Sequence, residues 1–216
     1  SPEGLSLAGS PGGGAAVVKT VRFAGGPHTV SGVIAIRNGG REPLVLDDFR
    51  ILCARVQTAA RSRRDEPAEV IAPGADGRTI SRTSAARVGT AASAVETRWV
   101  AVKEGYGLAF LKVGRPGNLL AVREGTAAVV GVVYPRLEIP PGGVETIPYS
   151  LYAGPSDYFI ARREIAEPVF GNGIFAAMGR LIFQALGAVH RVVPNWGLAI
   201  ILLTLTVRGL MFPIAQ

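Results

Sequence analysis

A series of short apolar runs, each bounded by turn residues, constrains the fold of this chain more than any other feature. Eight runs rich in Val, Ile, Leu and aromatic residues lie between positions 16 and 153. Glycine supplies a positive φ and proline a fixed φ at the reversals between them. The turn residues at these boundaries are Asn38-Gly39, Glu104-Gly105, Glu124-Gly125 and residues 140–143. Because short turns join antiparallel strands, we predict a mainly β fold, an antiparallel β-sandwich, over residues 17–155.

Composition and local pattern limit the rest of this region. The chain has 28 glycines and 15 prolines among 216 residues, which excludes an all-helical bundle. Residues 1–16 have many glycines and no hydrophobic period, so we predict a flexible lead-in there. Residues 61–98 are mostly polar and form a long excursion that the sequence does not place. The chain begins without Met and ends shortly after Pro213, so we expect further sequence beyond both ends.

The charge pattern argues against nucleic acid as a partner. The formal net charge is +7, from 23 basic and 16 acidic residues. The arginines are scattered, and their one cluster, at positions 61–64, is followed at once by Asp65 and Glu66 without interleaved aromatic residues. Cys53 is the single cysteine, so it forms no intrachain disulfide, and we interpret it as a small hydrophobe in a strand.

Enzyme motifs are missing from the sequence. It contains no phosphate-binding Walker loop, no Gly-x-Ser-x-Gly, no HExxH and no paired Cys motif. The spacing Gly171-x-Gly173-x-x-Ala176 imitates a dinucleotide fingerprint, but it follows no convincing strand. We therefore predict a protein that is not an enzyme and has no cofactor and no catalytic or metal-binding residues.

The hydrophobic period changes after Gly154-Pro155. We expect a short helix capped by Ser156, and from Ile174 a helix with apolar residues at spacings of three and four and polar Arg180, Gln184 and Arg191 opposite. This pattern alone fits a helix on a soluble core or one at a membrane surface. Residues 197–215 contain a single charge, which suits a membrane span. We therefore predict an amphipathic interfacial helix within 156–193 and a transmembrane helix over 194–216. The interfacial residues are Phe175, Met178, Leu181, Ile182 and Leu186.

The single charge of the predicted span is Arg208. Eleven residues separate it from Gly197, about 17 Å at 1.5 Å per residue, near the middle of a hydrocarbon core roughly 30 Å thick. The guanidinium either faces a polar cavity or snorkels toward the far surface. Thr204 lies one turn earlier on the same face, which favours the polar cavity.

Two stretches of the chain resemble a known family. Residues 195–213, NWGLAIILLTLTVRGLMFP, combine an Asn-Trp-Gly opening, Thr and Arg one turn apart, and an Arg-Gly-x-Met-Phe-Pro ending. They resemble the first conserved core transmembrane helix of the YidC family of bacterial membrane protein insertases. Residues 149–155, YSLYAGP, resemble the last strand of that family's periplasmic domain.

The resemblance implies a fold and a location. It implies a periplasmic β-supersandwich, an interfacial helix and a multi-pass core in the bacterial inner membrane, with residues 1–193 on the periplasmic side. Arg162, Arg163 and Arg191 lie on that side, against the usual bias of positive charge toward the cytoplasm.

The resemblance also implies an activity. It implies insertion and folding of integral membrane proteins through a hydrophilic groove, alone or with the Sec translocon. Arg208 and Thr204 match the substrate-contacting groove residues of the family. The implied partners are nascent membrane proteins, the Sec translocon with its accessory subunits, and the lipid bilayer.

Two alternatives remain open from the sequence. In one, the β-sandwich is a periplasmic binding module for sugar or peptide that a single membrane span anchors. In the other, the chain is a single-span envelope scaffold in which the charge at position 208 is dispensable.

Overall fold

The computed structural model describes residues 4–12, 14–23, 26–58, 67–76, 79–90, 92–157, 160–161, 165, 169 and 174–211. The chain divides into two compact units, Ser1–Val169 and Phe170–Gln216. The first unit is built of strands and the second of helices.

The elements with described bounds in the first unit are ten strands and one short 3-10 helix. The strands are β1 (Gly4–Gly12), β2 (Ala15–Arg22), β3 (Thr29–Asn38), β4 (Leu44–Gln57), β5 (Glu69–Pro73), β6 (Ile80–Ser84), β7 (Glu96–Glu104), β8 (Gly107–Glu124), β9 (Ala127–Ile139) and β10 (Val144–Pro155), and the 3-10 helix is η1 (Ala85–Arg87). All of their pairings are antiparallel. The predicted mainly β, antiparallel fold is therefore confirmed for this unit.

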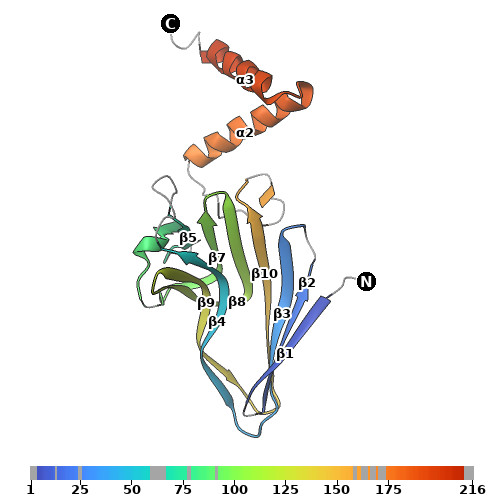
Figure 1. The fold of residues 1–216 in the computed structure, drawn as a ribbon, viewed down its shortest axis with the longest axis vertical. Coiled ribbons are helices and arrows are strands. Elements are labelled where there is room, and N and C mark those ends of the chain that lie inside the picture. The colour runs from blue at the N-terminus through green and yellow to red at the C-terminus, as the bar shows by residue number, and fades with distance from the viewer. Residues whose placement is uncertain are drawn as a thin grey trace. The chain divides into compact units, whose positions relative to one another are not determined.

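The ten strands form one hydrogen-bonded sheet, and β8 connects its two layers. The main order is β1-β2-β3-β10-β8-β7-β5-β6, while β9 pairs with both β8 and β4. The first half of β8, up to Val113, pairs with β10, and the second half, from Asn118, pairs with β9. The sequence predicts two separate strands here, at 108–113 and 118–124, but the structure makes them one. In Figure 1 the β4–β9 pair lies in front of β7 and β8 rather than over β1 and β2.

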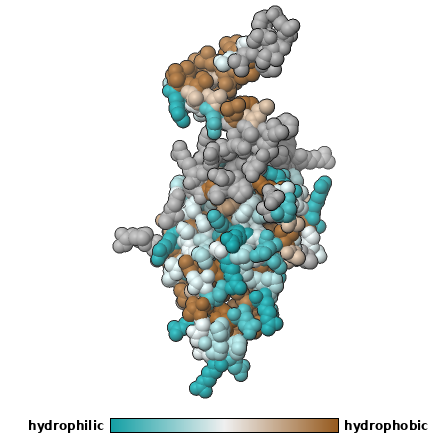
Figure 2. Space-filling view, turned by 180° about the vertical axis from the view of Figure 1, so that it is seen from behind, coloured by the Kyte–Doolittle hydropathy of each residue, from teal (hydrophilic) through white to brown (hydrophobic). Residues whose placement is uncertain are grey.

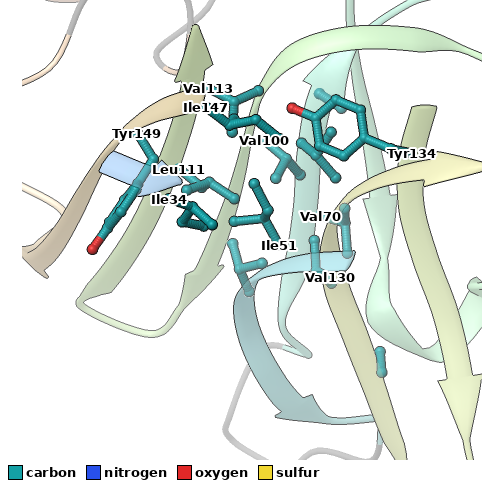
Figure 3. Close-up of a cluster of buried hydrophobic side chains, with 14 of the residues drawn as sticks. Ile34, Ile51, Val70, Val100, Leu111, Val113, Val130, Tyr134, Ile147 and Tyr149 are labelled. Atoms are coloured by element: carbon teal, nitrogen blue, oxygen red, sulfur yellow. The ribbon is translucent and has the colours of Figure 1, made fainter. Parts of the chain in front are cut away.

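The hydrophobic core lies between the β4–β9 pair and the main sheet. Val100 from β7, Leu111 from β8, Val130 from β9 and Ile147 from β10 belong to one buried cluster, and each is almost fully buried. Figure 3 shows these side chains converging from both layers. Alternating residues of the strands supply this cluster, which is why the period of two in the sequence predicts a sandwich.

Three of the four predicted turns, Glu104-Gly105, Glu124-Gly125 and residues 140–143, are confirmed, whereas Gly39 of Asn38-Gly39 does not have a positive φ. Gly105, Gly125 and Gly142 have φ angles of 54°, 63° and 70°, in the left-handed region that glycine adopts without steric strain. Asn38 ends β3 and is buried. Its Nδ2 donates to the carbonyl oxygens of Glu42 at 2.8 Å and Ile139 at 2.9 Å, and its Oδ1 accepts from the Gly40 amide at 2.9 Å.

The structure differs from the predicted flexible lead-in at residues 1–16. Residues of β1 pair in register with β2, with Leu5 opposite Val21 and Leu7 opposite Lys19. The sequence of β1 is rich in glycine, which is uncommon in strands, so its local pattern does not predict a strand. Its order comes from backbone hydrogen bonds to β2, a partner that the pattern of β1 alone does not specify.

The polar excursion and the segment after β10 also belong to this unit. The excursion contains β5, β6 and η1, while residues 59–66 lie outside the described residues. Beyond β10, Ala161, Ile165 and Val169 are buried, and Arg82 Nη2 of β6 donates to the Val169 carbonyl at 2.8 Å. The segment predicted to lead into the amphipathic helix is therefore part of the β-strand unit up to Val169. At its start Asp157 Oδ1, rather than Ser156, accepts from the Ile160 amide at 3.2 Å.

Within residues 174–211, the described part of the second unit, the structure has two helices. They are α2 (Ile174–Val192) and α3 (Trp196–Met211). Both helices were predicted from the apolar spacing, and their starts agree with the predicted ones within two residues. No helix among the described residues is both long enough and apolar enough for a membrane span, and α3 has 16 described residues.

Candidate functional site

The candidate interfacial surface lies on α2. Met178, Leu181 and Ile182 are each more than half exposed, and Leu186 is half-buried. The side chain of Phe175, the fifth predicted residue, lies outside the described side chains. Phe183, which the sequence analysis does not name, is also more than half exposed. In Figure 2 hydrophobic colours dominate the described surface of α2 and α3, whereas the β-strand unit shows a mixed surface.

A short elbow joins α2 to α3. The rings of His190, in the last turn of α2, and Trp196, the first residue of α3, stack with centroids 3.8 Å apart and planes inclined by 15°. Asn195 caps α3, because its Oδ1 accepts from the amides of Gly197 at 2.9 Å and Leu198 at 3.3 Å. Two otherwise unpaired helix N–H groups are thereby satisfied. Each residue of the Asn-Trp-Gly opening thus has a local structural role. Asn195 caps α3, Trp196 stacks on His190, and Gly197 donates its amide to the cap in the first turn.

The polar face of α3 carries Thr204 and Arg208. Arg208 is exposed and makes no hydrogen bond or ion pair with the described residues. The Thr204 hydroxyl donates to the Ile200 carbonyl at 2.7 Å, one turn earlier, and not toward Arg208. Thr206 makes the same type of bond to Leu202 at 2.9 Å. In such a bond the threonine O–H donates to a carbonyl of its own helix, so the hydroxyl needs no donor partner outside an apolar helix.

The structure therefore brings the two predicted groove residues onto one helix face without linking them. A threonine oxygen that donates to the backbone still has lone pairs to accept a bond, and the free guanidinium has five N–H donors. A carboxylate or a backbone carbonyl of a passing polypeptide would match the guanidinium donors of Arg208, and a backbone N–H would match the Thr204 oxygen. The remaining residues of the face are apolar, so the charge on Arg208 is the strongest polar feature of α3.

Among the hollows of the β-strand unit, we consider for the binding-module alternative the one beside β5 and β6. Its volume is about 290 Å³, and it lies between β5, β6 and β8. Its lining is mixed: the apolar Ala72 and Leu119, the hydroxyl-bearing Ser81 and Thr83, and the charged Arg87. The described residues contain no group of three or more His, Cys, Asp or Glu side chains placed to hold a metal ion.

Cys53 lies in β4 with its thiol directed into the sandwich. Its Sγ donates to the Val100 carbonyl at 3.8 Å across the core. Burial raises the pKa of the thiol to about 12, which keeps it protonated and unreactive near neutral pH. This environment agrees with its interpretation as a small hydrophobe.

Comparison with known proteins identifies the sequence relatives. The chain is 38% identical over 88 residues to the membrane protein insertase YidC of Dechloromonas aromatica, covering 39% of this chain and 16% of the relative. It is 33% identical over 123 residues to YidC of Shewanella amazonensis, covering 55% and 23%. It is 29% identical over 133 residues to YidC of Pseudomonas fluorescens, covering 59% and 24%. The chain thus spans between a sixth and a quarter of the length of these relatives.

Comparisons with protein-family models and with solved structures do not extend the similarity found by sequence. No protein-family model matches the chain. Among solved structures it is similar to an alpha-galactosidase from Lactobacillus brevis, with a TM-score of 0.48, 15% identity, and coverage of 72% of this chain and 24% of that one. It is also similar to the Slr1438 protein from Synechocystis, with a TM-score of 0.41, 9% identity, and coverage of 70% and 61%. Neither similarity supports an argument about function.

The fold and the sequence relatives together define the class of the chain. A β-strand unit is followed by an amphipathic helix and an apolar helix, and the related proteins are bacterial membrane protein insertases. Over 39–59% of its length the chain is similar in sequence to members of the YidC family.

Proposed function

We propose that this chain is part of a membrane protein insertase, which inserts and folds integral membrane proteins in the bacterial inner membrane. The sequence relation to three named insertases carries this proposal. The alternative of an anchored sugar- or peptide-binding module is not favoured, because these relatives carry no such name. No catalytic reaction is assigned, since insertion breaks and forms no covalent bond.

In this proposal α3 and the residues around it span the membrane, and α2 lies in the interface on the periplasmic side. The exposed apolar residues of α2 would then contact acyl chains, each buried side chain contributing about 1.5–3 kcal/mol. The multi-pass core and cooperation with the Sec translocon are part of the same proposal and follow from the family resemblance.

Arg208 and Thr204 would line a hydrophilic groove. An arginine at mid-bilayer depth costs on the order of 3 kcal/mol or more, so a helix retains one there when it faces water or a polar ligand. Arg208 has no partner among the described residues, which leaves its charge available to an acidic extracytoplasmic tail of a client. The free energy for insertion comes from transfer of the client's apolar segment into lipid. The groove reduces the thickness of water-free hydrocarbon that the client's polar tail must cross.

A charge exchange tests this function. This chain replaces the matching segment of the Dechloromonas aromatica relative, in a bacterium depleted of its own YidC. The clients are two single-span proteins that differ only in tail charge, one acidic and one basic. Arg208→Glu should lower insertion of the acidic-tail client roughly tenfold, equivalent to about 1.4 kcal/mol, and improve insertion of the basic-tail client.

Arg191→Glu is the matched control. It makes the same charge change at an exposed residue of α2, outside the proposed groove, and should leave both clients unaffected. Equal insertion of both clients by Arg208→Glu and the unsubstituted chimera would overturn the proposed role of Arg208. Failure of the unsubstituted chimera to insert either client would overturn the proposed function of the chain.

A further inference from the structure

The hollow beside β5 and β6 has an apolar floor that belongs to the hydrophobic core. Val70 and Ala72 of β5, and Val88 after η1, line it and are buried members of the main cluster. Leu119 and Ala121 of β8 line it as well and are only partly buried. Because the lining also includes exposed residues, a ligand from solvent can reach this apolar floor.

Two hydroxyl groups line the hollow from β6. Thr83 lies opposite Val70 and Ser81 opposite Ala72, so both hydroxyls share a face of the hairpin with the core residues. Neither hydroxyl makes a hydrogen bond with the described residues. Each can therefore donate a hydrogen bond to a ligand or accept one from it.

Two guanidinium groups lie beside η1 at the rim of the hollow. Arg87 lines the hollow, is exposed, and makes no hydrogen bond or ion pair with the described residues. Arg123 lies on the same face of β8 as Leu119, because two residues of a strand separated by an even number share a face. Its Nη2 donates to the Ala86 carbonyl at 2.7 Å, and its amide donates to the Gly89 carbonyl at 2.8 Å. Arg123 thus holds η1 in place, and Arg87 keeps its N–H donors for a ligand.

The carboxylates of the β5–β6 hairpin have other partners. Glu69 lies on the opposite face of the hairpin and pairs with Arg82 at 3.3 Å. Asp76 Oδ1, in the turn, accepts from the amide and the hydroxyl of Thr79 at 2.9 and 2.7 Å. The described lining of the hollow contains no Asp or Glu. The rim therefore has a positive potential that attracts an anion.

Volume and lining limit the class of ligand. The hollow, about 290 Å³, is roughly twice the size of a cavity that holds one benzene molecule, so a ligand of about twelve non-hydrogen atoms fits. The described lining has no aromatic ring on which a base could stack. One guanidinium beside an apolar floor matches one carboxylate attached to a short apolar group.

From this combination we propose that the hollow is a binding site for a small amphipathic carboxylate. The carboxylate pairs with the guanidinium of Arg87. The short apolar group contacts Val70 and Leu119, and a polar group between the two ends meets the hydroxyl of Thr83. A free organic acid and the carboxyl end of a polypeptide share this chemistry. The site does not depend on the proposed groove at Arg208 or on insertion.

Two matched compounds test the proposal. N-acetyl-leucine has a carboxylate and about twelve non-hydrogen atoms, and N-acetyl-leucinamide has the same shape without the charge. The whole chain is reconstituted in nanodiscs of neutral phosphatidylcholine, and binding is measured by saturation-transfer NMR with empty nanodiscs as the blank. We expect a dissociation constant on the order of 1 mM for the acid and at least about tenfold weaker binding of the amide. Hydrogen exchange should show new protection of amides in β6 and η1 when the acid binds.

Three variants localise the binding. Arg87→Gln should raise the dissociation constant of the acid at least about tenfold and leave that of the amide unchanged, because it removes only the charge. Thr83→Val, which keeps the side-chain size, should weaken both compounds by about threefold through loss of the hydroxyl. Arg37→Gln is the matched control, since Arg37 is exposed on β3 and three strands separate β3 from β5 in the sheet order. It should bind both compounds as the unsubstituted chain does.

A third compound, 4-methylpentanoate, distinguishes the two sources of the carboxylate because it lacks the acetamido group. Binding as tight as that of N-acetyl-leucine supports a free acid as the ligand, and weaker binding supports the end of a polypeptide.

Four results would overturn the proposal. They are equal binding of the acid and the amide, no saturable binding of the acid up to about 20 mM, an equal loss in Arg37→Gln and Arg87→Gln, and complete displacement of the acid by an equal concentration of inorganic phosphate. The last result would mean that the rim recognises charge alone. Binding of the acid by a chain that inserts no client would contradict the proposed function and leave this site supported.

Discussion

Replacing Asn38 by aspartate should strongly destabilise the β-strand unit, although the two side chains have nearly the same size. The change is isosteric, but a carboxylate cannot donate to the carbonyl oxygens of Glu42 and Ile139, which the amide now serves at 2.8 and 2.9 Å. Each lost bond removes about 1 kcal/mol, and unsatisfied buried carbonyls and a buried charge add to this. We expect a total loss of about 3–5 kcal/mol at pH 7.

The loss should depend on pH with a defined sign. Burial and two facing carbonyl oxygens raise the folded-state pKa of the introduced carboxyl above its unfolded value of about 3.9. The folded state then binds the proton more tightly than the unfolded state. The variant is therefore closest to the unsubstituted chain below pH 3.9, and its deficit grows as the pH rises toward the folded-state pKa.

Urea unfolding of the whole chain measures this effect. Trp99, whose ring stacks on Phe110 with centroids 5.8 Å apart, reports on the unit when Trp196 is replaced by Phe to remove the second signal. With a slope of about 2 kcal/mol per M, the midpoint should fall by about 2 M. Asn118→Asp is the control, since the half-buried Asn118 side chain makes no hydrogen bond to the described residues. Equal midpoints for the two variants would refute the reasoning.

Two further predictions concern the sandwich. Gly131→Ala should destabilise the unit by about 1–3 kcal/mol, because the added Cβ would lie 2.2 Å from the Ile51 carbonyl oxygen. The control is Gly89→Ala, where the added Cβ meets open space. It should change stability by less than about 0.5 kcal/mol in the same unfolding assay. Cys53 should react with iodoacetamide at pH 8 roughly a thousandfold more slowly in the folded chain than in urea, because its pKa is raised to about 12, and equal rates would contradict its burial.

The local pattern predicts much of the candidate site because helices are determined by neighbours in sequence. The positions of Thr204 and Arg208 on one face, and the start of α3 after Asn195, follow from the helical period and from capping chemistry. The direction of the Thr204 hydroxyl toward Ile200, and the stacking of His190 on Trp196, do not follow from the period. They depend on side-chain rotamers and on the backbone path between α2 and α3, which the helical period does not specify.

The sequence by itself determined that the chain is mainly β with two terminal helices, because alternation, turn residues and the period of 3.6 are local properties. Only the tertiary structure decided that residues 4–12 form an edge strand, that β8 runs unbroken through both layers, and that the segment up to Val169 packs with the strands. Each of these depends on pairing between segments distant in sequence, whose partner and register no local pattern specifies.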